Sequence, residues 1–231
     1  ALRLAIEDLA TTFGPRYPGG PEFLRRLAEL EPQVQPLADK GGQRDAQERE
    51  AWTQLQQQLT ALRDEALLAN PLLDFDRLLL VKRGNGAPQL GLPRNWQSNS
   101  SLAKTGYDDE IAVLSPVRPD GQLTTLFKPD GGRFVGDVDL DFDAGKLLFS
   151  MPGDNQHWQV FEIQADGAGL RQLTGEQPDV DSYDACYLPD GRIMFTSSAC
   201  FIGVPCVYGS SHVTVLYSMD ADGKNIRQLC F

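Results

Sequence analysis

The sequence predicts a mainly β chain: a partial β-propeller of about three blades, preceded by an α-helical N-terminal extension. Glu and Gln, which favour helix interiors, are concentrated in residues 1–70, whereas Asp, which favours turns, is concentrated in residues 71–231. A unit of about 46 residues, made of short apolar runs joined by Asp-Gly turns, recurs in the second part. We therefore expect a helical extension over 1–70 and blades over approximately 75–130, 133–180 and 181–231.

The first 70 residues carry two helix patterns. One begins at Gly20-Pro21-Glu22, since Pro suits the first turn, and continues with apolar residues at helical spacing: Phe23, Leu27, Leu30, Val34 and Leu37. Because Pro32 and Pro36 interrupt this face, we expect a break or kink after about Glu31. Asp45 is expected to cap a longer helix to about Asn70, with the apolar stripe Trp52, Leu55, Leu59, Leu62 and Ala66. The stripes indicate packing against the rest of the chain or a docking or dimerising hairpin.

Short apolar runs separated by turn signals indicate strands in the second part. The runs are 78–81, 111–114, 123–127, 146–150, 159–163, 192–196 and 213–219. Asp-Gly pairs lie between many of them, at 120–121, 130–131, 166–167, 190–191 and 222–223. Such pairs are typical of tight connections between antiparallel strands.

The recurring unit indicates a propeller. Residues 160–174 (VFEIQADGAGLRQLT) and 216–230 (LYSMDADGKNIRQLC) match at an offset of 56, and 138–150 matches 184–196 at an offset of 46. The difference predicts a ten-residue insertion between Ser197 and Ser211. The order strand, Pro-Asp-Gly, two strands, Asp-Ala-Asp-Gly, strand ending in Arg-Gln-Leu resembles the TolB-type blade repeat. A closed propeller needs at least four blades, so we expect a piece of a longer protein, and both ends of the sequence read as cut.

Composition and motifs exclude several functions. The net charge is −11 and the 21 Lys and Arg residues are scattered, which excludes non-specific nucleic-acid binding. No apolar run is long enough to span a membrane. The sequence contains no Gly-x-Ser-x-Gly, P-loop, His-Glu-x-x-His or haem-attaching C-x-x-C-H motif. We therefore predict no catalytic residue and no resident cofactor in this chain, apart from the cation considered next.

Four aspartates alternate with apolar residues: Asp137, Asp139, Asp141 and Asp143. In a strand, this alternation would place all four carboxylates on one face, where they could bind Ca²⁺. The alternative is a solvated strand face, or one that lines the channel. Asp179, Asp181 and Asp184 lie at the matching place in the next unit, which favours a structural role in each blade.

Several single residues could carry chemistry or modification. If the protein is exported, Cys200 and Cys206 could form a loop disulfide, while Cys186 is expected to be a small core residue. His157 and His212 could each be a ligand or a base, or a packed or surface residue. Asn99-Ser100-Ser101 matches a glycosylation acceptor.

Several segments resemble proteins related to the hydrazine synthase alpha subunit, a family of large exported bacterial proteins. They are 13–20 (FGPRYPGG), 70–83 (NPLLDFDRLLLVKR), 105–111 (TGYDDEI), 132–138 (GRFVGDV), 183–191 (YDACYLPDG) and 199–212 (ACFIGVPCVYGSSH). The resemblance covers about residues 1–231. It implies an exported protein, periplasmic or extracellular, in which propeller blades precede domains with covalently bound c-type haems. This chain lacks the haem-attachment motif, so haem is expected only in a longer parent chain.

The leading hypothesis is a non-catalytic propeller scaffold or binding module of a larger hydrazine-synthase-alpha-like protein. Its partners would be the remaining blades and domains of that protein, and other protein subunits. A second hypothesis makes this chain part of a c-type haem redox enzyme. A third is a carbohydrate- or peptide-binding propeller, which predicts that aromatic residues such as Trp96, Tyr107, Trp158 and Tyr208 gather on one face. Fold analogy alone does not separate these hypotheses.

Overall fold

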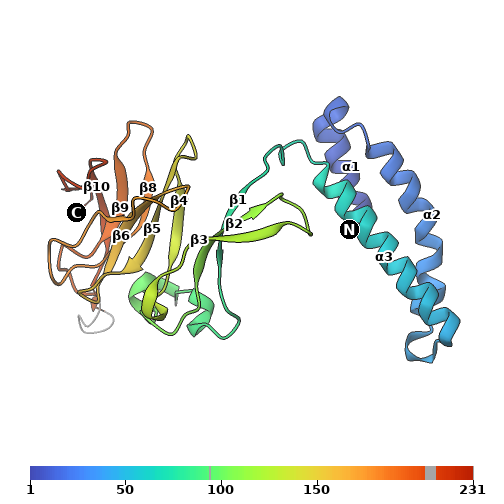
Figure 1. Cartoon of the computed structure of the whole chain (residues 1–231), viewed down its shortest axis with the longest axis horizontal. Helices are drawn as coiled ribbons and strands as arrows, with labels where there is room; N and C mark the ends of the chain where they lie inside the picture. The colour runs from blue at the N-terminus through green and yellow to red at the C-terminus, as the bar shows by residue number, and fades with distance from the viewer. Residues whose placement is uncertain (94, 206–211, 231) are drawn as a thin grey trace. The chain divides into compact units, whose positions relative to one another are not determined.

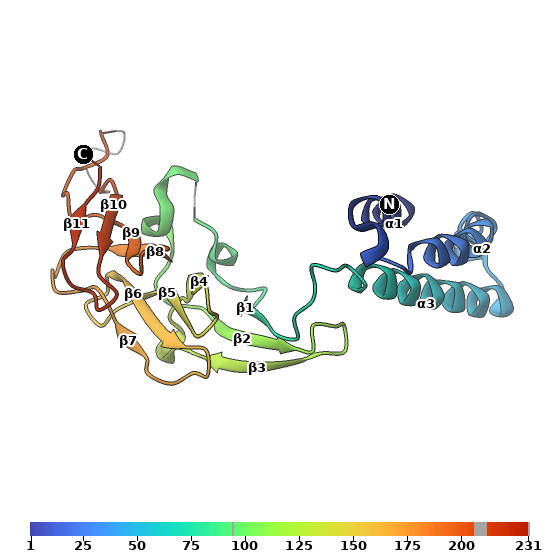
Figure 2. The same ribbon diagram turned by 90° about the horizontal axis from the view of Figure 1, so that it is seen from above.

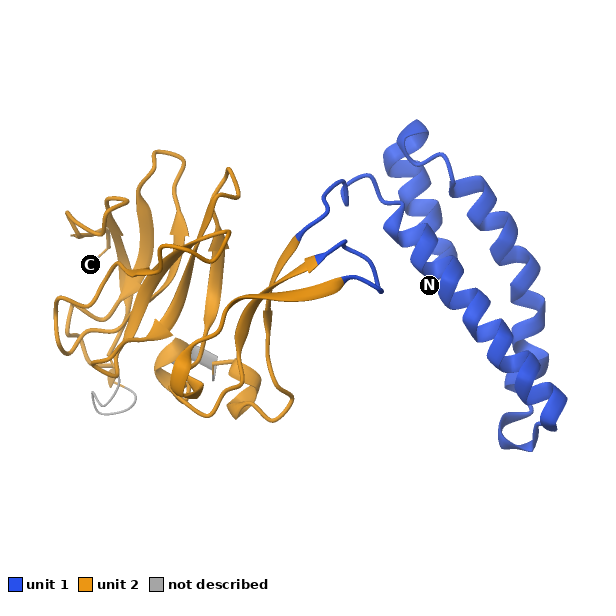
Figure 3. Cartoon of the chain, viewed as in Figure 1, with its two compact units in different colours: residues 1–77, 115–121 blue, residues 78–114, 122–231 orange. Residues whose placement is uncertain are grey.

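A computed structural model describes residues 1–93, 95–205 and 212–230. Helices come first along the chain and three antiparallel sheets follow, so the class is mainly β with N-terminal helices, as the sequence predicts (Figure 1). The chain forms two compact units, residues 1–77 with 115–121 and residues 78–114 with 122–231 (Figure 3). Among the described residues, no helix has both the length and the apolar character that a membrane crossing requires.

The helical unit contains α1 (Leu2–Phe13), α2 (Gly20–Ala38) and α3 (Ala46–Leu68). Their apolar faces meet in one buried cluster, made of Ile6, Leu9, Tyr17, Phe23, Leu27, Leu62 and Ala66. The buried Tyr17 hydroxyl donates a hydrogen bond to the carbonyl of Ala66, at 2.8 Å. The cluster includes part of both predicted apolar stripes, so those parts pack against each other within the helical unit.

The structure corrects the predicted end of α2. The helix does not stop near Glu31 but continues through Pro32 and Pro36 to Ala38. Each proline removes one backbone hydrogen bond, to the carbonyls of residues 28 and 32. Residues 28, 32 and 36 are all exposed, so water can hydrate the freed carbonyls and the helix persists.

The start of α3 confirms the predicted cap. The Asp45 carboxylate accepts a hydrogen bond from the Glu48 backbone N–H at 2.8 Å. In return, Glu48 accepts one from the Asp45 backbone N–H at 3.2 Å. This reciprocal pair is a capping box, which satisfies two backbone donors at the helix start.

Three antiparallel sheets form the β unit. The first sheet holds β1 (Leu78–Lys82), β2 (Glu110–Ser115) and β3 (Gln122–Phe127) in that order. The second holds β4 (Gly136–Leu140), β5 (Lys146–Pro152), β6 (Trp158–Gln164) and β7 (Arg171–Gln172). The third holds β8 (Ser182–Tyr187), β9 (Ile193–Ser197), β10 (Val215–Met219) and β11 (Arg227–Gln228). Within the described residues these sheets follow one another without closing into a ring (Figure 2).

The second and third sheets are two copies of one four-stranded unit, for which we keep the word blade. Phe161 pairs with Gln172 and Tyr217 pairs with Gln228, which confirms the offset of 56 for their last two strands. Leu140 pairs with Leu147, whereas Tyr187 pairs with Ile193. The offset is therefore 46 for β5 and β9 but 47 for β4 and β8 (187 − 140), because the β8–β9 turn is one residue shorter. The single offset of 46 that the sequence predicts for residues 138–150 is therefore wrong for β4 and β8.

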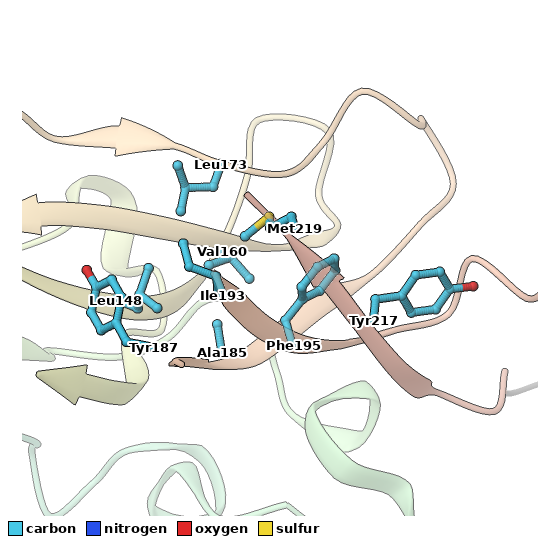
Figure 4. Close-up of a cluster of buried hydrophobic side chains, with 9 residues drawn as sticks. All are labelled: Leu148, Val160, Leu173, Ala185, Tyr187, Ile193, Phe195, Tyr217 and Met219. Atoms are coloured by element: carbon cyan, nitrogen blue, oxygen red, sulfur yellow. The ribbon is translucent and has the colours of Figure 1, made fainter. Parts of the chain in front are cut away.

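The sheets are held together by apolar side chains from facing strands. Leu148, Val160 and Leu173 of the second sheet pack against six residues of the third, Ala185, Tyr187, Ile193, Phe195, Tyr217 and Met219 (Figure 4). A similar cluster joins Ile111 of the first sheet to the opposite face of the second, at Val135, Leu147, Phe149, Met151, Phe161 and Ile163. An aromatic pair recurs at the same place in the two blades: Phe149 with Phe161, and Phe195 with Tyr217.

The repeated Asp-Gly and Arg-Gln-Leu motifs contact each other across neighbouring sheets. Arg171, at the start of one Arg-Gln-Leu, donates to the carbonyl of Ala221 in the Asp-Gly turn of the next blade, at 2.8 Å. In the same turn, Gly223 has φ +84°, and a Cβ there would lie 2.7 Å from the carbonyl oxygen of Leu173. Gly167 repeats this arrangement one blade earlier, with φ +86° and 3.0 Å to the carbonyl oxygen of Leu126. Glycine is required because the turn has a left-handed conformation and touches the preceding sheet.

Candidate functional site

The four alternating aspartates do not share a strand face, so that prediction is wrong. β4 ends at Leu140, and Asp141 and Asp143 lie beyond it, at the turn that leads to β5. Before that, the strand contains a bulge at Asp137, which has φ +50° and shifts the register between Gly136 and Asp139. A bulge ends the simple in–out alternation on which the prediction rested. Asp184, with φ +54°, forms the corresponding bulge in β8.

Asp137 is a half-buried carboxylate held by protein donors. The Asn99 side chain, itself buried, donates to it at 2.6 Å. Desolvation by burial raises the pKa of Asp137, and the nearby charge of Asp184 adds to the rise, while hydrogen bonds from Asn99 and Ser150 oppose it. Asn99 thus serves a structural purpose, and its burial argues against the predicted glycosylation at this position.

The other aspartates of the group also have structural partners. Asp139 accepts a hydrogen bond from the backbone N–H of Tyr187 at 2.9 Å, which ties β4 to β8. Asp141 accepts one from the backbone N–H of Gly145 at 2.9 Å, within its turn. No three His, Cys, Asp or Glu side chains of the described residues are grouped so that they could hold a metal ion. The structure therefore gives the calcium prediction for Asp137, Asp139, Asp141 and Asp143 no support.

The second and third sheets, together with the segment between β1 and β2, form a polar pocket of about 200 Å³. Its lining residues come from segments far apart in the sequence: Ser100, Lys104, Trp158, Asp181, Tyr183, Ser198, His212 and Thr214. Ser100 and Lys104 belong to the β1–β2 connection, which includes the short helical segments Pro88–Gly91 and Asn95–Ser101. Leu102 anchors this connection by packing in a cluster with Tyr107, Phe134, Trp158 and Tyr183.

One of the residues that line the pocket has an unsatisfied donor. Trp158 is fully buried, and its indole N–H has no hydrogen-bond partner among the described residues. A buried donor without an acceptor costs about 1–3 kcal/mol. By contrast, the Tyr183 hydroxyl donates to Thr214 at 3.2 Å, and burial raises the pKa of Tyr183, so this phenol is neutral at physiological pH.

Asp181 is the acidic side chain and Lys104 the lysine side chain among the residues that line the pocket. Asp181 is fixed by two donors on one oxygen, the Trp158 backbone N–H at 2.9 Å and His157 Nδ1 at 3.0 Å. Lys104 is half-buried, and none of the ion pairs formed within the described residues involves it. A few precisely placed polar groups fix the orientation of a small molecule in its pocket.

The structure places the remaining predicted residues as follows. His157 supports Asp181, and His212 lines the pocket, so both histidines lie near one site that their sequence positions did not reveal. Cys186 lies half-buried on β8, and burial raises the pKa of its thiol, which fits a packed residue. The predicted disulfide between Cys200 and Cys206 stays a prediction, because Cys206 is outside the described residues. Of the four aromatic residues, Tyr107 and Trp158 are buried rather than on an open face, and Tyr208 and the Trp96 side chain are outside the description.

The outer face of the third sheet is a second candidate site. The repeat offsets place Met194, Leu216 and Leu229 at the positions that Leu148, Val160 and Leu173 occupy in the second sheet. Those three residues of the second sheet are 0%, 0% and 8% exposed, because the third sheet covers them. Leu216 and Leu229 are 39% and 47% exposed. The third sheet thus repeats an interface surface without a covering sheet in the described chain.

Comparisons with known proteins give only distant structural likeness. No family model matches the chain, and the search of curated proteins finds no match. Solved structures that it resembles include TolB from Acinetobacter baumannii, with 18% identity, a TM-score of 0.38, and coverage of 54% of this chain and 27% of that chain. For hydrazine synthase from Kuenenia stuttgartiensis, the identity is 16% and the TM-score 0.46, and the match covers 63% of this chain and 21% of that chain. For an oligogalacturonate lyase in complex with manganese, the identity is 14% and the TM-score 0.44, and the match covers 68% of this chain and 39% of that chain.

The chain therefore spans from about a fifth to two fifths of the length of these structures. No functional residue is transferred from them to this chain. The three antiparallel sheets of the chain itself define its fold class, and a fold of this kind does not by itself imply a function.

Proposed function

We propose that this chain is a non-catalytic propeller scaffold whose third sheet docks a further four-stranded sheet of the same type. The observation that supports this is the exposed apolar face at Leu216 and Leu229, the counterparts of Val160 and Leu173 in the buried interface between the second and third sheets. The occupant is inferred from continuity with that interface, since the exposed face repeats its apolar pattern. A further sheet would present an aromatic pair like Phe195 and Tyr217 to it.

The energetic gain of docking is appreciable. Fully burying a Leu or Met side chain contributes roughly 1.5–3 kcal/mol. Leu216 and Leu229 are about half exposed and Met194 is partly buried already, so covering the three contributes about 2–4 kcal/mol. This is enough to favour ordered packing between parts of one protein, where little association entropy is lost.

The Arg-Gln-Leu motif of the third blade supports the same partner. In the second blade, Gln172 donates to the Thr174 carbonyl at 2.6 Å, and in the third Gln228 donates to the Cys230 carbonyl at 2.8 Å. The local structure of the motif is therefore the same in both. In the second blade this arrangement receives the Asp-Gly turn of the following sheet, so the third is shaped to receive one too.

In this proposal the docked sheet belongs to a larger exported protein related to the hydrazine synthase alpha subunit. The support for that relation is the sequence resemblance of the segments from 70–83 to 199–212. Any haem chemistry would belong to other domains of that protein, because this sequence carries no C-x-x-C-H motif.

Cysteine labelling tests the docking face. Leu216→Cys would be labelled with a maleimide in this 231-residue chain and in the polypeptide that the complete gene encodes, which the proposal expects to be longer, and labelling would be read by peptide-level mass spectrometry. We expect labelling at least tenfold slower in the longer protein. Leu170→Cys is the matched control, because Leu170 is 45% exposed in a turn of the second sheet and should react equally in both. Equal labelling of Leu216→Cys in both proteins, or a gene that encodes no further sheet, would refute the proposal.

A further inference from the structure

The pocket described above contains one positively and one negatively charged side chain that do not form an ion pair with each other. Lys104 supplies one positive charge and Asp181 one negative charge. Among the described residues these two groups form no ion pair with each other, although both line the same cavity. Lys104 has no carboxylate partner within the described residues, so it is suited to a ligand anion. Asp181 is bonded to His157 and to the Trp158 backbone through Oδ1, which leaves Oδ2 suited to a ligand cation. A simple anion would meet Lys104 but would be repelled by Asp181.

The hydrogen-bond donors of the pocket favour the same kind of ligand group as Lys104 does, a negatively charged acceptor. The buried indole N–H of Trp158 needs an acceptor. Ser198, which is 2% exposed, accepts a hydrogen bond from the Asp181 backbone N–H at 3.0 Å and can still donate its own proton. Together with Lys104, these groups suit the two oxygens of a carboxylate, which accept charge-assisted hydrogen bonds.

The acceptor of the pocket is equally well prepared. Asp181 Oδ1 receives both the Trp158 backbone N–H and His157 Nδ1, which fixes the orientation of the carboxylate. Within the described residues, the hydrogen bonds of the Asp181 side chain all involve Oδ1, so Oδ2 is the oxygen that can accept from a ligand ammonium. Pre-oriented groups of this kind favour binding because little side-chain entropy is lost.

The volume limits the size of the ligand. About 200 Å³ is below the roughly 300–1,000 Å³ of pockets that hold drug-sized molecules. A chain of several sugar units or peptide residues does not fit, and a molecule of few non-hydrogen atoms does.

From these features we infer that the pocket binds a small free α-amino acid as its zwitterion. The carboxylate would be held by Lys104, the Trp158 indole and Ser198, and the ammonium by Asp181. This inference is independent of the docking of a further sheet, because the pocket and the outer face at Leu216 use different residues.

Isothermal titration calorimetry of the 231-residue chain with glycine, L-alanine and L-serine tests the inference. We expect saturable binding of these zwitterions, and binding at least tenfold weaker of acetate and of methylammonium, which each carry one of the two charges. Lys104→Met and Asp181→Asn should each weaken glycine binding at least tenfold, and Trp158→Phe, which keeps the ring and removes the N–H, about fivefold. Lys224→Met is the matched control, because Lys224 is exposed outside the pocket and its loss should leave binding unchanged.

Each other outcome overturns the inference. Acetate that binds as tightly as glycine would indicate a simple anion site, and no binding of any of the three amino acids would indicate a structural, water-filled cavity. If the Asp181 or Trp158 variants lose their native circular dichroism spectrum, the comparison of glycine with acetate and methylammonium on the unsubstituted chain decides the matter without them.

Discussion

Gly223→Ala is the sharpest test of how neighbouring sheets pack. Gly223 lies in the Asp-Gly turn of the third blade, with φ +84°. A Cβ there would lie 2.7 Å from the backbone oxygen of Leu173 in the second sheet, a contact that real Cβ atoms do not make. Because the obstacle is backbone, it cannot move aside as a flexible side chain can. The substitution must therefore push the two sheets apart at this turn.

The chain offers a matched control that separates two contributions. Gly191 also has φ +84°, but a Cβ on it would meet no atom within 4 Å. Gly191→Ala should therefore cost only the left-handed backbone penalty, about 1–2 kcal/mol. Gly223→Ala adds the steric contribution, about 1–3 kcal/mol for overpacking at a close contact. Gly167→Ala, with its 3.0 Å approach to Leu126, should fall between them.

Thermal unfolding of the three variants, followed by circular dichroism of the strands, measures these costs. In a domain of 150–250 residues, 1 kcal/mol shifts the midpoint by roughly 2–4 °C. We expect the order Gly191→Ala, Gly167→Ala, Gly223→Ala, from least to most destabilised. Equal midpoints for Gly191→Ala and Gly223→Ala would show that the turn does not touch the preceding sheet.

Three further substitutions test charges and caps. Glu162→Gln should destabilise by about 3 kcal/mol at neutral pH, because it breaks a buried carboxylate network. Burial raises the pKa of Glu162, but hydrogen bonds from Lys146, Arg171 and Tyr187 outweigh it and lower the pKa below its unfolded value of 4.5. The stability that the charged Glu162 contributes is therefore lost as pH falls below that value. Urea titrations should show the stability difference between Glu162→Gln and the unsubstituted chain shrinking over the same range. Asp137→Asn should stabilise at neutral pH, since the raised pKa of Asp137 shows that its buried charge is unfavourable; the gain should vanish below about pH 4, and exposed Asp143→Asn should change nothing. Asp45→Ala should lower the stability of the helical unit by about 1 kcal/mol in the same titrations, through loss of the α3 cap.

The features that could be predicted from sequence are those that local chemistry determines. The Asp45 cap depends on residues three positions apart, and the apolar runs that became β5 and β6 are bounded by their own turn residues. The repeat also allowed predictions beyond local sequence, because the same structural unit occurs twice in the chain. Offsets within the chain thus predicted which segments correspond in the two sheets, without any other sequence.

The features that were missed depend on tertiary surroundings. Pro32 is tolerated in α2 because that side of the helix faces water, which periodicity does not specify. The bulge at Asp137 breaks a perfect alternation because Asn99 and Ser150, from other segments, hold the carboxylate. The pocket could not be predicted, since Lys104, Trp158 and Asp181 meet only when the sheets stack. The only local sign of the pocket was a polar residue, Asp181, immediately before the start of a strand, β8.

The positions identical in the two clearest copies of the repeat explain why the third sheet should have a neighbour. In the second blade, Arg171 reaches the next turn and the Leu173 carbonyl receives the glycine of that turn, so Arg-Gln-Leu and Asp-Gly are the two halves of one contact. The third blade supplies its Asp-Gly half to the second and carries a second Arg-Gln-Leu half, Arg227 to Leu229, on its outer side. Gln228 adopts the same local bond there as Gln172 does in the covered copy, so this half is already formed before a partner docks. In the proposed scaffold, this pre-formed half-contact beside the exposed Leu216 would let a further sheet be added with little loss of conformational entropy.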